Sequence, residues 1–180
     1  MKKSIFILAL FLSINAFSQK LYTKTGLTEF KASVQAFEPV EAKNNSTSAV
    51  LNAETGDIAA LLFVKAFNFR VALMQEHFNE NYMDSNKYPK ATFKGKVEGF
   101  ELDKVDINTE YPIKGTLTVR GVKKEINTTG TFTKSGDHVY LKASFSVKPG
   151  DFDIKIPSIV RKKIAGTINV ILDYEFVEKK

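Results

Sequence analysis

Residues 113–120 read Ile-Lys-Gly-Thr-Leu-Thr-Val-Arg, and this stretch decides the fold class. Apolar or small residues occupy its odd-numbered positions, whereas polar or charged residues occupy its even-numbered positions. Because successive side chains of a β-strand point to opposite faces, this alternation predicts a strand with one buried face. Residues 138–148 and 164–177 carry the same alternation and are predicted as further strands.

The same pattern extends over most of the chain. Further strands are expected at residues 21–25, 28–35, 49–54, 58–67, 91–99 and 124–133. Glycine-containing turn signals separate them at residues 54–57, 120–121 and 135–137. Strands that each hide one face pack as a sandwich or close into a barrel, and closure removes exposed sheet edges. We therefore predict an all-β fold, an antiparallel β-barrel of about eight strands.

One stretch breaks the alternation. Apolar side chains recur there at helical spacings of three and four, at Val71, Met74, Phe78 and Tyr82. Asn68 is a candidate N-cap for this helix, and Pro89 prevents it from running further. We expect one inserted helix over residues 70–82, which caps one end of the barrel. A shorter helical turn is expected over residues 158–162.

The N-terminus has the pattern of a secretory signal peptide. A short basic segment precedes the apolar run of residues 5–12, and small residues stand before Gln19. An apolar run of this length is too short for a spanning helix, which needs roughly 20 residues. We expect residues 1–18 to be a cleaved signal peptide and residues 19–180 to form the mature domain. The expected location is periplasmic or secreted, without a membrane span.

Composition excludes several kinds of chemistry. The chain has 180 residues, which fits one globular domain, and it contains no cysteine. Disulfides, cysteine-ligated metals and a cysteine nucleophile are therefore excluded. The two histidines, His77 and His138, are far apart in the sequence, and no phosphate-binding loop or serine-nucleophile motif is present. We expect no enzymatic activity, no cofactor and no metal site.

Charge patterning argues against a nucleic-acid partner. The formal net charge is +6, but the lysines are interleaved with Asp and Glu, and the longest basic cluster covers only residues 161–163. Nucleic-acid binding requires a concentrated basic stripe. No nucleic-acid partner is therefore expected. The sequence leaves the oligomeric state open, with a homodimer as one alternative.

Several motifs, taken in order, resemble the YceI-like family. Residues 87–95 (Lys-Tyr-Pro-Lys-Ala-Thr-Phe-Lys-Gly), preceded by His77-Phe78 and Asp84-Ser85, are similar to its middle signature. Residues 115–124 resemble its G-x-L-T-x-x-G-V-T-K strand and turn, with Lys123 where Thr is common. Residues 151–154 (Asp-Phe-Asp-Ile) resemble its D-F-x-I segment. The resemblance covers residues 20–177.

This resemblance implies a lipocalin-like barrel with an apolar interior, in a periplasmic or secreted protein. Some members of the family bind long isoprenoid chains, quinone-type molecules or other amphiphiles. The expected function is thus non-enzymatic binding of a lipophilic small molecule. Two alternatives remain open: a barrel with a filled core that acts through its surface as an envelope interaction or stress-response protein, and an enzyme that uses the apolar bore.

The candidate ligand-binding residues come from the apolar face of the helix and from strand parity, meaning the alternate positions of each strand that face the barrel interior. They are Phe67, Phe69, Met74, Phe78, Phe93, Leu117, Val119, Phe132, Leu141, Phe145, Phe152, Ile168 and Val170. Inward faces that combine large apolar side chains with glycine and alanine fit a hollow barrel, but they fit a solid Phe-rich core equally well. Periodicity does not distinguish a hollow barrel from a solid one, so each candidate fits a residue of a filled core as well as a ligand contact.

Overall fold

A computed structural model describes residues 19–34 and 37–178, and the predicted signal peptide lies outside them. Within this part of the chain, nine strands form one sheet. They are β1 (Lys20–Ser33), β2 (Glu41–Asn52), β3 (Asp57–Phe63), β4 (Asn68–Phe69), β5 (Lys90–Val97), β6 (Thr109–Val119), β7 (Val122–Ser135), β8 (His138–Val147) and β9 (Ile164–Glu178). Short 3₁₀ turns are η1 (Val64–Ala66), η3 (Leu102–Lys104) and η4 (Pro149–Phe152).

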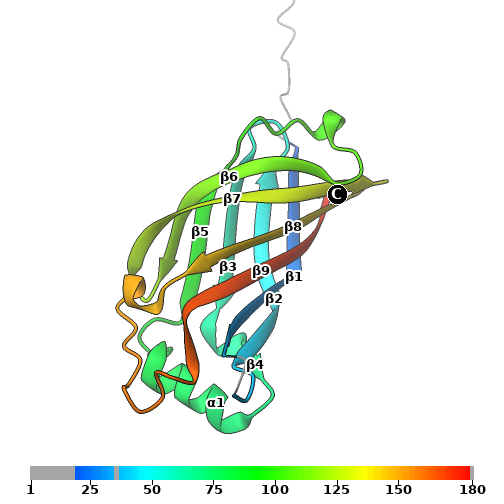
Figure 1. The fold of residues 1–180 in the computed structure, drawn as a ribbon. Helices are drawn as coiled ribbons and strands as arrows, with labels where there is room; N and C mark the ends of the chain where they lie inside the picture. The colour runs from blue at the N-terminus through cyan, green and yellow to red at the C-terminus, as the bar shows by residue number, and fades with distance from the viewer. Residues whose placement is uncertain (1–18, 35–36, 179–180) are drawn as a thin grey trace, which may run out of the picture.

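The sheet closes on itself. Its strand order is β1-β9-β8-β7-β6-β5-β3-β2, and β1 also pairs with β2, so eight strands of the described chain form the barrel wall (Figure 1). All the pairings are antiparallel. The two-residue β4 is not part of this wall and pairs only with the start of β2, where Phe69 lies opposite Ala42. The predicted antiparallel barrel of about eight strands is confirmed.

Tight turns hold the wall strands in register. Val119 of β6 pairs with Val122 of β7, and the two residues between them, Arg120 and Gly121, have φ values of 50° and 79°. Two positive φ values in a two-residue loop are typical of the type I′ hairpin turn, which matches the twist of the flanking strands. The turn expected at residues 120–121 is therefore confirmed.

The first strand is longer than expected. β1 includes the segment predicted at residues 21–25 and, as far as Ser33, the one predicted at residues 28–35, whose last residue lies outside the described chain. The two join because the pairing of β1 with β2 shifts register between Thr23 and Gly26 and again before Thr28. An irregularity of this kind interrupts the period of two without ending the strand. Gly26 is required there, because a Cβ at this position would lie 2.6 Å from Cδ1 of Tyr174.

The start of β2 is polar and was missed. Asn44 is fully buried, yet its side chain donates a hydrogen bond to the carbonyl of Phe63 (3.0 Å) and accepts one from the backbone N–H of Ser46 (2.9 Å). A buried amide with its hydrogen bonds made is compatible with a barrel wall. Hydrophobic patterning alone does not detect such a strand.

The inserted helix forms in two parts. α1 (Ala72–His77) is α-helical, and η2 (Phe78–Tyr82) continues it as a π-helical turn at one end of the barrel (Figure 1). The candidate N-cap was wrong: Asn68 pairs with Lys43 as part of β4, and the capping position is Val71. Residues 158–162 form successive hydrogen-bonded turns and not a helix. No helix in the described residues is long and apolar enough to cross a bilayer.

The end of the barrel away from α1 is filled, and we call it the filled end. The rings of Phe100, Tyr111 and Phe132 meet there with centroids 5.2–5.7 Å apart. Phe132 and Phe176 are completely buried. The connection between β5 and β6, which carries η3, lies over this end (Figure 1). This end of the barrel is therefore packed with apolar side chains.

Candidate functional site

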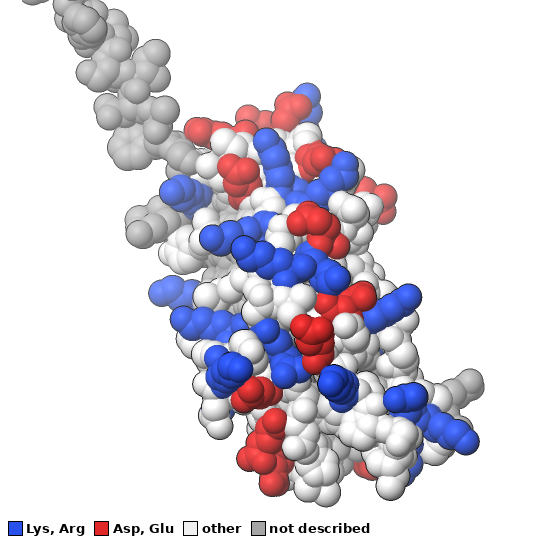
Figure 2. Space-filling model, turned by 90° about the vertical axis from the view of Figure 1, so that its left-hand side faces the viewer, with Lys and Arg blue, Asp and Glu red and all other residues white. Residues whose placement is uncertain are grey.

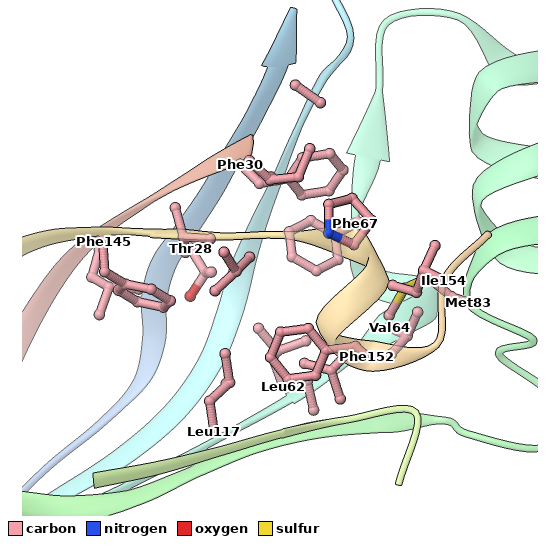
Figure 3. Close-up of a pocket in the computed structure, with 18 of the residues that line it drawn as sticks. Thr28, Phe30, Leu62, Val64, Phe67, Met83, Leu117, Phe145, Phe152 and Ile154 are labelled. Atoms are coloured by element: carbon pink, nitrogen blue, oxygen red, sulfur yellow. The ribbon is translucent and has the colours of Figure 1, made fainter. Parts of the chain in front are cut away.

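The other half of the barrel is hollow. A cavity of about 400 Å³ lies between the filled end and α1, and all eight wall strands in the described chain contribute to its lining. This volume lies within the range of about 300–1,000 Å³ that is typical of small-molecule sites. Figure 3 shows that the labelled side chains around it are almost entirely carbon. The cavity is thus an apolar chamber with one closed end.

Four phenylalanine rings form the end of the chamber beneath the helix. Phe30 of β1 stacks on Phe78 of η2 at 5.3 Å, and Phe69 meets the same Phe78 ring at 5.0 Å. Phe67 contacts both Phe30 (5.2 Å) and Phe78 (5.6 Å) edge-on. Such ring pairs contribute roughly 0.5–1.5 kcal/mol beyond their area burial. They connect the capping helix to the barrel wall, as the helical periodicity predicted.

The inward-facing glycines do not create the space. Gly95 and Gly115 lie opposite each other on β5 and β6, and a Cβ at either position would lie within 2.8 Å of Cζ of Phe93. The Phe93 ring therefore fills the room that these glycines leave. The void lies instead between the filled end and α1.

Most of the candidates chosen by parity line this cavity. Twelve of the thirteen, all within the described residues, do so: Phe67, Phe69, Met74, Phe78, Phe93, Leu117, Val119, Leu141, Phe145, Phe152, Ile168 and Val170. The exception is Phe132, which faces inward as expected but lies in the filled end against Phe100 and Tyr111. Contact with a ligand stays a prediction for all of them.

Sequence reasoning missed part of the lining. The connection between β8 and β9 contributes Ile154, Ile156 and Val160, and β1 contributes Phe30. Phe152, Ile154 and Ile156 alternate with polar residues, so a period-two signal was available in this segment. The connection is not a strand, however, and its apolar side lies over the cavity only because it folds back across the barrel end near α1.

Few polar groups face the cavity. Among the described lining residues, the cationic or imidazole side chains are Lys163 and His77, and both are exposed at the end nearest α1, which we call the mouth. Deeper inside, the hydroxyl of Thr28 lies 2.8 Å from that of Thr47 and 3.0 Å from that of Tyr174. Hydrogen bonding and apolar burial are therefore the interactions that the interior can provide.

Burial raises the pKa of the Tyr174 phenol above its ordinary value of 10.0, although hydrogen bonds from Thr28 and Thr47 partly oppose the shift. The phenol is therefore harder to ionise in the folded state than in the unfolded state. Its contribution to the free energy of unfolding is complete below the pKa of an unfolded tyrosine and is lost as the pH rises toward the folded-state pKa.

We expect the free energy of unfolding to fall above about pH 10 in the wild-type protein, and to fall less in Tyr174→Phe, which has no phenol to ionise. Urea unfolding of both proteins from pH 8 to pH 11 measures the difference. Parallel pH dependences for the two proteins would contradict the buried, neutral phenol.

The surface carries charges of both signs. Figure 2 shows lysine and arginine interleaved with aspartate and glutamate on one side of the barrel. Ion pairs such as Lys114–Glu98 (2.9 Å) and Lys142–Asp173 (3.7 Å) are exposed, so each contributes little to stability. Across residues 19–34 and 37–178, no group of three His, Asp or Glu side chains is placed to hold a metal ion. The expectation of no nucleic-acid partner stays a prediction.

A family model described as the YceI-like domain matches residues 15–176 of the chain. The chain belongs to the YceI-like family. This membership agrees with the ordered motifs found in the sequence and with the closed barrel that encloses the cavity. No curated protein matches the chain significantly by sequence.

Solved structures share this YceI-like fold. A polyisoprenoid-binding domain from Saccharophagus degradans, implicated in plant cell wall breakdown, superposes with a TM-score of 0.77 at 13% identity, over 90% of this chain and 99% of that one. BcnA from Burkholderia cenocepacia gives 0.69 at 16% identity, over 84% and 96%. The YceI protein of Campylobacter jejuni gives 0.63 at 20% identity, over 80% and 87%. At these identities the likeness shows the fold alone.

Proposed function

We propose that this YceI-like protein binds and carries a long-chain lipophile, such as a polyisoprenoid, a quinone-like molecule or a fatty amphiphile. The observation that carries the proposal is the apolar chamber of about 400 Å³, closed at the filled end and lined from every wall strand of the described chain. Burial of apolar surface contributes roughly 25 cal/mol per Å², so a hydrocarbon chain gains affinity there without many polar contacts. The Saccharophagus degradans relative, described as polyisoprenoid-binding, supports the same ligand class.

We propose a carrier and not an enzyme. The imidazole and the amine of the described lining, on His77 and Lys163, lie at the solvent-exposed mouth, away from the hydroxyl groups deeper inside. General acid–base catalysis requires a positioned donor and acceptor around one reacting atom. A chamber of this kind instead favours burial of an unreactive chain.

We also propose that the carrier acts in the cell envelope, in the periplasm or after secretion. The support is the pattern of residues 1–18, a basic start followed by an apolar run and small residues. N-terminal sequencing of protein recovered from the periplasm would test it. A mature chain that begins at Gln19 is expected.

The test of lipophile binding is organic extraction of the purified full-length protein, followed by mass spectrometry. We expect one lipophilic species at close to one equivalent per chain, or saturable binding of an added prenyl alcohol if the purified protein is empty. A matched sample of a variant with its cavity filled (Ala60→Trp, discussed below) controls for lipid adsorbed to the surface. Equal recovery from both proteins, or no lipophile and no binding by the wild type, would refute the proposal.

A further inference from the structure

The connection between β8 and β9 carries a cluster of positive charge beside the mouth. We call its residues 154–163 the mouth loop, and they are orange in Figure 1, at the same end of the barrel as α1. No Asp or Glu stands between Asp153 and Asp173 in the sequence. The mouth loop contains four exposed cations in this stretch: Lys155, Arg161, Lys162 and Lys163.

None of these four cations forms an ion pair with a carboxylate of the described residues. The ion pairs found there join other side chains, as Lys114 and Glu98 do. The helical segment at the same end is acidic by comparison, because Glu76 of α1 and Glu80 of η2 are exposed. The positive charge at the mouth therefore belongs to the mouth loop, and it is available to an anionic partner.

The mouth loop also exposes an apolar side chain between its cations. The backbone N–H of Val160 donates to the carbonyl of Pro157 (3.1 Å), and that of Lys163 donates to the carbonyl of Val160 (2.8 Å), so the loop folds into successive turns. Val160 lines the cavity, whereas Ile159 is 85% exposed, the highest value among the large apolar side chains of the described residues. Leu73 of α1 is exposed at the same end. A single exposed isoleucine is common on protein surfaces, but here it is combined with unpaired cations at the opening of an apolar chamber.

This combination matches the surface of an anionic bilayer. The boundary between head groups and acyl chains accepts an apolar side chain, and anionic head groups attract lysine and arginine. A nucleic acid would attract the same cations but would leave Ile159 in water. A bilayer is also the phase in which a long-chain lipophile resides, and the mouth loop borders the opening through which such a guest enters.

We propose that the mouth loop docks this protein on the surface of an anionic phospholipid bilayer, with Ile159 at the boundary between head groups and acyl chains. Docking in this orientation places the mouth against the bilayer and the filled end away from it. A guest then passes between the bilayer and the chamber without crossing bulk water. This consequence rests on the proposed lipophile binding, whereas the docking itself does not.

The absence of tryptophan from the chain allows a reporter to be placed at the proposed contact. Ile159→Trp introduces the only indole of the protein at the exposed position of the mouth loop. We expect its fluorescence maximum to shift to shorter wavelength with vesicles of equal parts phosphatidylglycerol and phosphatidylcholine, because the indole moves from water into the bilayer interface. Vesicles of phosphatidylcholine alone are expected to give no shift at the same lipid concentration. Each variant is purified after export from the same host, so that all samples share one N-terminus.

Ile107→Trp is the matched control for the orientation. Ile107 is 73% exposed, and it lies in the connection between β5 and β6 at the filled end. We expect its fluorescence to stay unchanged with either kind of vesicle. A shift at both positions would show adsorption without orientation and would overturn the proposal.

The charge of the mouth loop is tested in the Ile159→Trp background. The triple change Lys155→Gln, Arg161→Gln and Lys162→Gln is expected to weaken binding to the phosphatidylglycerol vesicles about a hundredfold, because each of these cations is attracted to the anionic surface. Lys163 is left in place because it also lines the cavity.

Three exposed lysines far from the mouth provide the matched control for net charge. Lys20 pairs with Asn52, Lys96 with Asp57 and Lys134 with Val139, next to turns at the end of the barrel away from α1 (Figure 1). Changing these three lysines to Gln in the same background alters the net charge equally. We expect this variant to keep the vesicle affinity of Ile159→Trp alone.

Guest binding is measured separately, without vesicles, by displacement of a fluorescent apolar probe by a prenyl alcohol. None of the changed lysines and arginines lines the cavity, so both charge variants are expected to bind the guest like the wild type. Equal vesicle affinity of the two charge variants, or an equal shift with both kinds of vesicle, would overturn the proposed docking and leave lipophile binding intact. A shift of Ile159→Trp with duplex DNA and not with vesicles would assign the surface to nucleic acid. Failure of the wild type to bind the guest would instead refute the proposed function.

Discussion

Phe132→Ala is expected to destabilise the protein by about 3–5 kcal/mol, the usual cost of removing a fully buried phenylalanine. Phe132 is 0% exposed, and its ring contacts those of Phe100 (5.2 Å) and Tyr111 (5.7 Å) in the filled end. Tyr111 belongs to β6 and Phe100 to the connection between β5 and β6, and both side chains are buried, so their rings cannot close the space that the substitution opens. Urea unfolding monitored by circular dichroism measures the loss.

Phe145→Ala is the matched comparison, because both side chains face inward and both changes remove the same atoms. The ring of Phe145 is only partly buried and borders the cavity, so its removal is expected to cost about 1–2 kcal/mol and mainly to weaken lipophile binding. Phe132→Ala is expected to leave binding nearly unchanged in the protein that remains folded. A loss of 3–5 kcal/mol for both variants would show that the chamber is filled in solution, which would favour a barrel that acts through its surface.

Ala60→Trp is expected to reduce lipophile affinity by about a hundredfold or more, with little loss of stability. Ala60 points into the cavity from β3, between Ala49 of β2 and Phe93 of β5. An indole placed there occupies space that a guest needs, and it fills a void without displacing a neighbour, unlike an enlargement within a dense core. Probe displacement by a prenyl alcohol measures the affinity, and thermal unfolding measures stability.

Ala59→Trp controls for the effect of adding an indole to β3. Ala59 is the adjacent residue, exposed on the outer face of the same strand, and it pairs with Val50 and Lys94. We expect this variant to bind like the wild type. If both variants bound normally, the guest would have to lie outside the chamber. If both lost binding, the effect would come from strand distortion and not from occupied space.

The alternation of residues 113–120 was sufficient to predict a wall strand, because a strand with one buried face imposes its own pattern on its own sequence. The same local logic identified the inserted helix from the spacing of Met74 and Phe78. It failed where tertiary contacts override the pattern: at the buried amide of Asn44, and at Asn68, which pairs in β4 instead of capping the helix. In each case the deciding partner lies on another element of the chain.

In the candidate site, too, the local pattern predicts some features and contacts with other elements decide the rest. Parity placed Phe132 and Phe145 on the inner surface, and the structure agrees, but one closes the filled end and the other faces the chamber. Parity reports which face of a strand a side chain occupies, whereas its height along the barrel depends on how the tilted strands pair. Phe132 lies opposite Leu141 and Phe145 opposite Val170, and neither pairing is visible in the segment that contains the residue.

The sequence by itself determined that the chain forms an antiparallel barrel, whose strands each bury one face, with a single inserted helix. It also excluded cysteine chemistry and supplied the motifs of the YceI-like family. Only the tertiary structure decided that the barrel is hollow toward the helix and solid at the other end, and that three hydroxyls from β1, β2 and β9 meet between the two. The physical reason is that alternation is a local consequence of one buried face, whereas empty volume and hydroxyl contacts depend on side chains that strand closure brings together from distant parts of the chain.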